Sequence, residues 1–287
     1  MNKTILLKSL YLHLYNELRS AGIEEPRLEA RILLAYAAGI TQTRIFAYPE
    51  DKIDTKIILR LEKMIARRKT GEPIAYIVST REFWSLNFQV SRDTLIPRPD
   101  SETIIEAVLG TIPDKTIPLT ILDLGTGSGC LLLALLSELP NAIGKGIDID
   151  RSAHMIAKRN SVNLGLNKRA GFQQGNWMDE VKESFDIIIS NPPYISDADM
   201  KNLDDSILFF EPHLALSGGP DGLEAYRVIG HQCISHLNPG GLLAVEIGMG
   251  QGHDIKVIFV ENGLKIKSVH HDIRNIERCI LATVKNS

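Results

Sequence analysis

The spacing of hydrophobic residues changes along the chain, and each change predicts a different kind of structure. From residue 4 to about residue 70, apolar residues recur every three or four positions, as at Leu6, Leu10, Leu14 and Leu18, which is the period of an amphipathic helix. Glycines divide this stretch into short helices, and no strand pattern interrupts it. We therefore expect a small all-α domain over residues 1–72.

The next stretch, EPIAYIVSTREFWSLNFQVS, alternates apolar and polar positions and contains several aromatic residues. This alternation is typical of an antiparallel β-hairpin. The proline-stiffened segment IPRPDSE follows it. We expect residues 73–100 to form a β-hairpin linker, with the change from one domain to the other near residue 85.

From residue 101 onward, short apolar runs alternate with helical patterns. The runs are TILDLG, KGIDID, AGFQQGN, FDIIIS, GLLAVEIG, KIKSVHHD and RCILATV. Repeated strand–helix units predict a mostly parallel sheet with helices on both faces. We expect residues 101–287 to form an α/β domain around these seven strands.

Composition places the chain among ordinary globular proteins, with 44% hydrophobic and 23% charged residues. A net charge of −3 argues against binding of nucleic acid by the overall charge of the protein. Charged residues interrupt the first apolar stretch, so no signal peptide is expected. The longest later apolar run, CLLLALL, is too short to span a membrane. We expect a cytoplasmic protein without a membrane partner.

Cysteine and histidine spacings do not suggest a metal site. Cys130, Cys233 and Cys279 are far apart and form no CxxC pair, which also disfavours a disulfide framework. The histidine pairs lack the spacing that places two imidazoles on one helical face. We expect no metal and a reducing compartment.

The stretch ILDLGTGSGC predicts a strand that turns sharply into a helix. Its turn consists of Gly125, Thr126, Gly127, Ser128 and Gly129. Glycines permit positive φ and let a ligand approach the backbone closely, although a tight turn alone would also explain them. The G-x-G-x-G spacing differs from the dinucleotide fingerprint, so the pattern favours another adenosine cofactor, above all S-adenosylmethionine.

Further cofactor residues are expected at the ends of the next two strands. Asp148 ends GKGIDID, where an acidic residue meets ribose hydroxyls in this topology. Asp150 is an alternative, but its position suits the N-cap of the following helix. After the third strand, Asn176 and Trp177 are placed to contact the adenine, unless Trp177 only packs in the core.

The stretch SNPPYI follows the fourth strand and so is expected at the same edge of the sheet. The Asn191 side-chain oxygen and the Pro192 carbonyl can accept the two N–H groups of an amide or aromatic amine, which orients its nitrogen for methyl transfer. Pro193 has no N–H to compete, and Tyr194 can stack on the acceptor. The alternative is that the prolines merely end a strand and Tyr194 packs.

Taken together, these motifs resemble the release factor glutamine methyltransferases, called PrmC or HemK, within the class I S-adenosylmethionine-dependent methyltransferases. The matching stretches, in order, are GEPIAYI with REFW, LIPRPDSE, DLGTGSGC, NPPYI, EPHLALSGGPDGLEAYR, GGLLAVEIG and IERCI. The resemblance implies a Rossmann-like seven-stranded sheet and a helical amino-terminal domain that helps to dock the substrate.

The same resemblance implies N5 methylation of the glutamine in the Gly-Gly-Gln motif of class I peptide chain release factors, by a monomer. It assigns the cofactor to residues 125–129, Asp148, Trp177 and Asn191, and the glutamine to residues 191–194. Ser79 and Ser85 depart from the family pattern, because glycines are usual there. The roles of Arg98 and Glu211 stay open.

Three other functions compete with this interpretation. SNPPYI is shared with methyltransferases of DNA adenine and ribosomal RNA guanine, which would need a basic groove; IARRK is the strongest basic cluster, and it also suits a helix end. A dehydrogenase would have no use for Asn-Pro-Pro-Tyr. A non-catalytic module on the same scaffold would have no need to keep Asn191 or the glycines.

Overall fold

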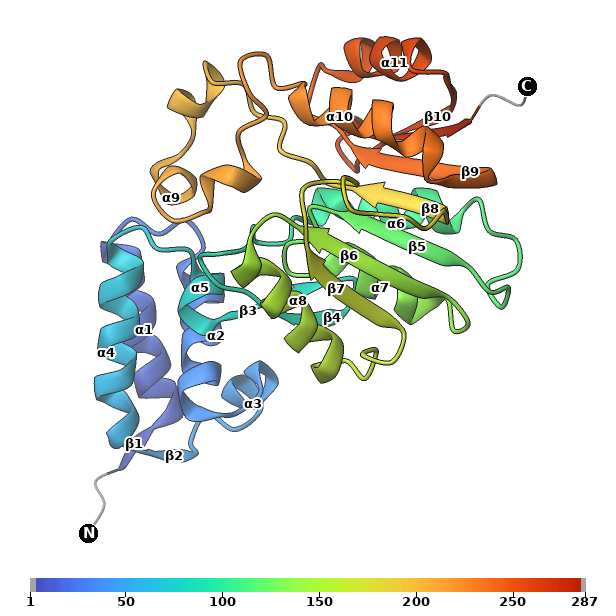
Figure 1. Ribbon diagram of the computed structural model, residues 1–287. Helices are drawn as coiled ribbons and strands as arrows, with labels where there is room; N and C mark the ends of the chain where they lie inside the picture. Colours follow the sequence, from blue (N-terminus) through green and yellow to red (C-terminus); the bar gives the residue numbers. More distant parts are fainter. Residues whose placement is uncertain (1–3, 285–287) are drawn as a thin grey trace. The chain divides into compact units, whose positions relative to one another are not determined.

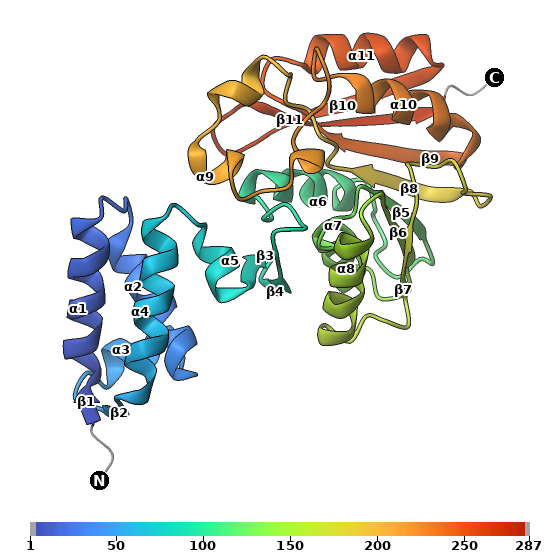
Figure 2. The same cartoon turned by 60° about the vertical axis from the view of Figure 1, so that its left-hand side comes forward.

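The computed structural model describes residues 4–284 and divides the chain into two compact units, Met1–Ser79 and Thr80–Ser287. Figures 1 and 2 show a helical first unit and a second unit built around one large sheet. The division lies a few residues before the expected change near residue 85, because the hairpin packs with the second unit.

The first unit consists mainly of helices packed around one apolar core. They are α1 (Leu7–Ser20), α2 (Pro26–Ala38), α3 (Gln42–Ala47), α4 (Lys56–Lys69) and α5 (Ile74–Val78). The buried stripe of α1 starts at Leu7 and continues through Leu10, Leu14 and Leu18. Leu6 instead ends a short strand and is only partly buried.

A small β-pair in this unit was not predicted. β1 (Thr4–Leu6) and β2 (Lys52–Asp54) pair antiparallel, so the expectation of a stretch without strands was wrong. Strands of three residues are too short to show a period of their own. The helical character of the unit is confirmed.

The expected hairpin is shorter than the predicted linker. It consists of β3 (Thr80–Phe83) and β4 (Leu86–Gln89), which pair antiparallel. The preceding residues form helix α5, not a strand, and Ala75 to Val78 in it are all buried. A short, fully buried apolar run does not distinguish helix from strand by its period.

Ser79 and Ser85, at the two positions where glycines were expected, both have a left-handed backbone. Ser79 ends α5 with φ 58°, and Ser85 lies in the hairpin turn with φ 58°, next to Trp84 at φ 52°. Left-handed conformations cost non-glycine residues about 1–2 kcal/mol. Both serines are therefore held with backbone strain.

The sheet of the second unit has seven strands, as expected. They are β5 (Thr120–Leu124), β6 (Ile143–Asp148), β7 (Ala170–Gln174), β8 (Phe185–Ser190), β9 (Leu237–Glu246), β10 (Leu264–His271) and β11 (Glu277–Val284). Their order is β10-β11-β9-β8-β5-β6-β7. The two pairings that β11 makes, with β10 and with β9, are antiparallel, and the other four pairings are parallel, so the sheet is mostly parallel.

Helices cover both faces of this sheet (Figures 1 and 2). One face carries α6 (Glu102–Leu109), α7 (Cys130–Glu138), α8 (Arg151–Asn163) and the hairpin. The other carries α10 (Glu224–Gln232) and α11 (Gly252–Glu261). Neighbouring strand residues alternate between the two cores, as Ile121 and Leu122 do. Because β5 pairs parallel with both β6 and β8, the carboxyl ends of these three strands meet at one edge of the sheet.

The segment between β8 and α10 contains little regular structure. It includes α9 (Asp205–Leu208) and the 3-10 turns η2 (Asp199–Asn202) and η3 (His213–Ala215). Within residues 4–284, no helix is both long and apolar enough to cross a membrane.

Candidate active site

The glycine turn after β5 adopts the conformation that its sequence predicts. Gly125, Gly127 and Gly129 have φ values of 66°, 55° and 80°. A Cβ at Gly125 would meet no atom within 4 Å, whereas one at Gly129 would lie 3.1 Å from the Cβ of Ala157 on α8. The first two glycines therefore serve the backbone conformation, and Gly129 also lets α8 approach the start of α7.

Asp148 lies at the end of β6 and bonds directly to the glycine turn. Its Oδ2 accepts a hydrogen bond from the Gly127 N–H at 2.8 Å, and its Oδ1 accepts one from the Asp150 N–H at 2.9 Å. Burial raises the pKa of Asp148, although the two backbone N–H groups oppose this. The carboxylate fixes the turn and keeps further lone pairs for a ligand.

Asp150 has the capping role that its position predicts. Its Oδ1 accepts hydrogen bonds from the backbone N–H groups of Ser152 and Ala153 at the start of α8, at 2.6 and 3.2 Å. The interpretation of Asp150 as an N-cap is confirmed. Asp150 also reaches the wall of the adjacent cavity.

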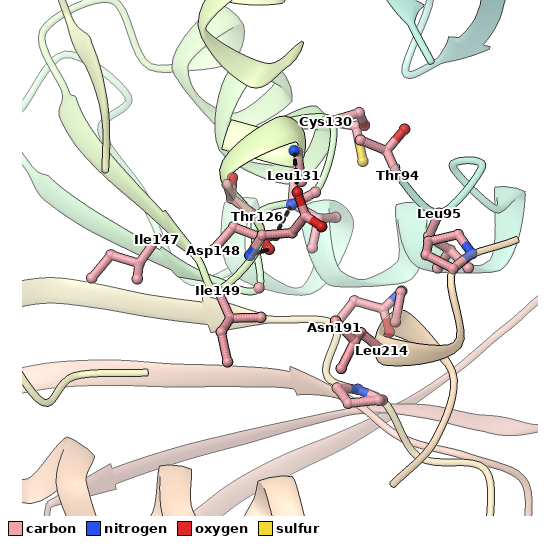
Figure 3. Close-up of a pocket in the computed structure, with 18 of the residues that line it drawn as sticks. Thr94, Leu95, Thr126, Cys130, Leu131, Ile147, Asp148, Ile149, Asn191 and Leu214 are labelled. Carbon is pink, nitrogen blue, oxygen red and sulfur yellow. Dashed lines mark hydrogen bonds between the residues drawn. The ribbon is translucent and has the colours of Figure 1, made fainter. Parts of the chain in front are cut away.

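A cavity of about 260 Å³ opens beside the glycine turn. Of the predicted cofactor residues, all but Gly129 line it: Gly125, Thr126, Gly127, Ser128, Asp148, Trp177 and Asn191. In Figure 3, Asp148 and Ile149 lie on one side of the cavity, and Asn191, Leu95 and Leu214 lie on the other. The fold thus brings together residues that are far apart in the sequence.

Trp177 and Asn176 lie at the rim near β7. Trp177 has φ 49° and lines the cavity. It also packs against the core on the sheet face that carries α10 and α11, so it has both of the positions considered for it. The amide of Asn176 also lines the cavity, but its Nδ2 donates to Asp179 Oδ2 at 2.9 Å.

The Asn-Pro-Pro-Tyr segment follows β8 and contributes residues to the walls of two cavities. Asn191 lines both the larger cavity and a neighbouring one of about 150 Å³. Pro193 lines the larger cavity, and Tyr194 lines the smaller one. The Pro192 side chain is buried and lines neither. The Asn191 Nδ2 donates a hydrogen bond to Ser101 Oγ at 3.1 Å.

Several polar groups near the site are buried. Burial raises the pKa of Asp123 to about 7, against the hydrogen bond that Thr126 Oγ donates at 2.6 Å. Burial likewise raises the pKa of Glu246 to about 7. Within the described residues, Asp123 Oδ1, Ser128 Oγ and Glu246 Oε2 have no hydrogen-bond partner. In the same part of the chain, no group of three or more His, Cys, Asp or Glu residues is placed to hold a metal.

Comparison with known proteins identifies the family. The PrmC N-terminal domain model matches residues 10–78, and the methyltransferase small domain model matches residues 104–211. The release factor glutamine methyltransferase of Rhodospirillum rubrum is 43% identical over 265 residues, which cover 92% of this chain and 81% of that protein. The chain belongs to the release factor glutamine methyltransferase family.

One further relative agrees with this family, and one solved structure agrees with the fold. The release factor glutamine methyltransferase of Caulobacter vibrioides is 38% identical over 284 residues, which cover 99% of this chain and 98% of that protein. The crystal structure of a methyltransferase from Pyrococcus furiosus is 19% identical, with a TM-score of 0.53, and covers 78% of this chain and 97% of that one. The second unit has the class I methyltransferase fold.

The larger cavity suits the adenosine cofactor that a methyltransferase of this family uses. Gly125 and Gly127 carry no side chain, and the space that a Cβ would take at Gly125 is open. The buried Ser128 hydroxyl lacks a protein partner in the described part of the chain. A backbone without side chains, a carboxylate and an unpaired hydroxyl form a cradle for a polar, adenosine-bearing molecule.

Part of the cavity wall was not predicted from the sequence. Asp93, Thr94, Leu95 and Pro97 come from the segment after β4, and Leu214 and Ala215 come from η3. These residue types carry no chemical signature. Leu95 and Pro97 lie within LIPRPDSE, and Leu214 and Ala215 lie within EPHLALSGGPDGLEAYR, so the two stretches were matched to the family although no role was assigned to these residues.

Proposed function

We propose that this protein transfers a methyl group to the N5 side-chain amide nitrogen of the glutamine in the Gly-Gly-Gln motif of class I peptide chain release factors. Membership of the release factor glutamine methyltransferase family supports the substrate. The observation that carries the chemistry is the position of Asn191, which lines both cavities. The proposed reaction takes place in the cytoplasm, with a monomeric enzyme.

The proposed cofactor is S-adenosylmethionine, which supplies an electrophilic methyl group when bound. We assign its binding to the glycine turn, residues 125–129, together with Asp148, Trp177 and Asn191. Asp148 already has one backbone N–H on each oxygen, and each oxygen keeps a lone pair for a hydroxyl donor. No metal takes part in the proposed reaction.

The proposed acceptor site is the smaller cavity, which Tyr194 lines. Because the Asn191 Nδ2 is occupied by Ser101, its Oδ1 is the end of the amide that can accept an N–H from the glutamine. The Pro192 carbonyl accepts the second N–H in this proposal. Two acceptors orient the nitrogen lone pair and stabilise the positive charge that develops on it.

Tyr194 has a separate role in the proposal. Burial raises the pKa of its hydroxyl, and the charge of Glu246 adds to this, so the phenol stays neutral. The hydroxyl donates to Glu246 Oε1 at 3.4 Å, and the Tyr194 backbone carbonyl accepts from Gln251 Nε2 at 2.9 Å. Held at both ends, the ring can stack on the planar amide and favour the developing cation.

Transfer of labelled methyl groups from S-adenosylmethionine tests the proposal. The acceptors are a purified release factor, its Gly-Gly-Gln→Gly-Gly-Ala variant, DNA and ribosomal RNA. We expect label on the unchanged factor alone. Label on nucleic acid and not on the factor would keep the nitrogen chemistry and overturn the substrate.

A further inference from the structure

The side-chain amide of Asn160, on α8, links β4 to the glycine turn of the larger cavity. Its Oδ1 accepts a hydrogen bond from the Gln89 N–H at 2.7 Å. Its Nδ2 donates to the Gln89 carbonyl at 3.0 Å and to the Ser128 carbonyl at 2.8 Å. Asn160 is fully buried. One buried amide therefore joins the last residue of β4 to the glycine turn.

The three bonds fix the orientation of this amide. An asparagine side chain carries two N–H hydrogens and one carbonyl oxygen, and here both hydrogens and the oxygen are in use. The Gln89 N–H can only bond to the oxygen, and the two backbone carbonyls can only bond to the nitrogen. Among the described residues, β4 pairs with β3 alone in a two-stranded sheet. The amide thus takes the place of a neighbouring strand at the free edge of β4.

α8 contacts the glycine turn at a second position. Ala157 lies one helical turn before Asn160, and its Cβ would be 3.1 Å from a Cβ at Gly129. This close packing limits how near α8 and the turn can come to each other. The bond from Asn160 to the Ser128 carbonyl limits how far they can separate. The two contacts together fix the turn relative to α8.

The bonds to Gln89 hold a second wall of the same cavity. Thr94 follows Gln89 by five residues, is 1% exposed and lines the cavity. The chain between them turns tightly: the Thr94 N–H donates to the Ser91 carbonyl at 3.0 Å, and the Ser91 N–H donates to Thr94 Oγ1 at 3.3 Å. Because this connection is short and internally bonded, the position of Gln89 determines where Thr94 and Leu95 lie in the wall (Figure 3).

We propose that Asn160 is a positioning residue that holds the glycine turn and residues 91–95 at the separation that S-adenosylmethionine needs. This inference rests on the proposed cofactor. Asn160 does not itself line the cavity, so it acts through the backbones of Ser128 and Gln89. Walls that are already in place lose less conformational freedom when a ligand binds, which strengthens binding. Without the amide, S-adenosylmethionine would have to order both walls.

Titration calorimetry of the whole protein with S-adenosylmethionine tests this role. Asn160→Leu keeps a side chain of similar shape but loses all three hydrogen bonds, and we expect the dissociation constant to rise about tenfold. Asn160→Asp keeps the acceptor for the Gln89 N–H and loses both donors, so its dissociation constant should lie between those of the wild type and Asn160→Leu.

Steady-state kinetics with a purified release factor give a second measurement. In Asn160→Leu the KM for S-adenosylmethionine should rise in parallel with the dissociation constant. At saturating S-adenosylmethionine, kcat should fall less than about threefold, because the bonds of Asn160 go to Gln89 and Ser128 and not to the Asn-Pro-Pro-Tyr segment. A general loss of folded enzyme would lower kcat and leave KM unchanged.

Asp186→Ala is the matched control. Asp186, near the start of β8, accepts hydrogen bonds from the Thr120 N–H, the Thr120 hydroxyl and the Asn238 Nδ2, each at 2.8 Å. It lines neither cavity of the site. Its replacement also removes three hydrogen bonds and should lower thermal stability, but it should change S-adenosylmethionine affinity less than about twofold.

The outcomes separate this inference from the proposed cofactor. If the wild-type protein does not bind S-adenosylmethionine, the proposed cofactor is wrong and the inference falls with it. If it does and Asn160→Leu binds equally tightly, the positioning role alone is overturned; should Asn160→Leu not fold, wild-type affinity in Asn160→Asp overturns it instead. The role is also overturned if Asp186→Ala loses as much affinity as the Asn160 variants.

Discussion

The guanidinium of Arg98 donates a hydrogen bond to the carboxylate of Glu211, with 2.5 Å between Nη2 and Oε1. The second oxygen of Glu211 accepts from the Ile96 N–H at 3.2 Å. The Glu211 side chain is 1% exposed, and that of Arg98 is 35% exposed. Since Arg98 lines both cavities, this pair ties two walls of the site together. It gives a structural role to two residues whose sequence context left their roles open.

Breaking this pair should destabilise the second unit. Glu211→Ala leaves the Arg98 guanidinium and the Ile96 N–H without their partner, and we expect the free energy of unfolding to fall by about 2–3 kcal/mol. Urea denaturation measures this. Arg227→Ala is the control, because it breaks an exposed pair with Asp221 whose side chains are 50% and 46% exposed, and it should cost less than about 1 kcal/mol. Equal losses in the two variants would contradict the role of Glu211.

Removing the Asp148 carboxylate should weaken cofactor binding. Asp148→Ala deletes hydrogen bonds to a charged partner worth about 1.5–3 kcal/mol, so S-adenosylmethionine affinity should fall about ten- to a hundredfold. Titration calorimetry measures the change. Asp150→Ala, which removes the cap of α8, should cost about 1 kcal/mol of stability and have the smaller effect on affinity. The reverse ranking would assign the ribose to Asp150.

Truncating Asn191 should separate catalysis from cofactor binding. Asn191→Ala removes the amide oxygen assigned to the acceptor, and we expect methyl transfer to a release factor to be abolished. S-adenosylmethionine affinity should be mostly retained, because the amide mainly serves the transition state. Single-turnover kinetics beside binding measurements test this. An active Asn191→Ala enzyme would sink the proposed mechanism.

Stability should depend on pH through two buried carboxyl groups. Burial raises the pKa of Asp123 and of Glu246 to about 7 in the folded protein. The folded state therefore binds more protons than the unfolded state between about pH 4 and pH 7. This contribution to stability is present below the unfolded pKa values and is lost as pH rises through about 7.

We expect the free energy of unfolding to fall between about pH 4 and pH 7 because of these groups. Asp123→Asn cannot ionise and should flatten the dependence. Glu180→Gln, at an exposed carboxylate of the same unit, should leave the slope as it is. Urea denaturation across this pH range tests the prediction, and an unchanged slope in Asp123→Asn would show that Asp123 does not ionise there.

The large elements could be predicted from the sequence because their patterns are long. The four-residue spacing of leucines predicted α1, and seven apolar runs predicted the strands of the sheet. Where a pattern is short it misleads: the buried run Ala75 to Val78 is equally compatible with a strand and a helix. Tertiary packing decided between them.

In the candidate site too, some residues could be predicted from the sequence and others could not. The glycine turn, Asp148 and Asn191 carry distinctive chemistry, and the structure brings them to one cavity. Leu95 and Leu214 also line that cavity, but leucines occur throughout the chain and nothing local distinguishes these two. The hydrogen bond that the Ser101 hydroxyl accepts from Asn191 could not be predicted either, because a serine before a helix normally indicates a cap.

The most direct test of the central claim is mass spectrometry of a purified release factor after incubation with this protein and S-adenosylmethionine. We predict one added methyl group, located by fragmentation on the glutamine side chain of the Gly-Gly-Gln motif, and none when the enzyme carries Asn191→Ala. A methyl group on another residue of the factor, or an unmodified factor beside methylated nucleic acid, would contradict the account.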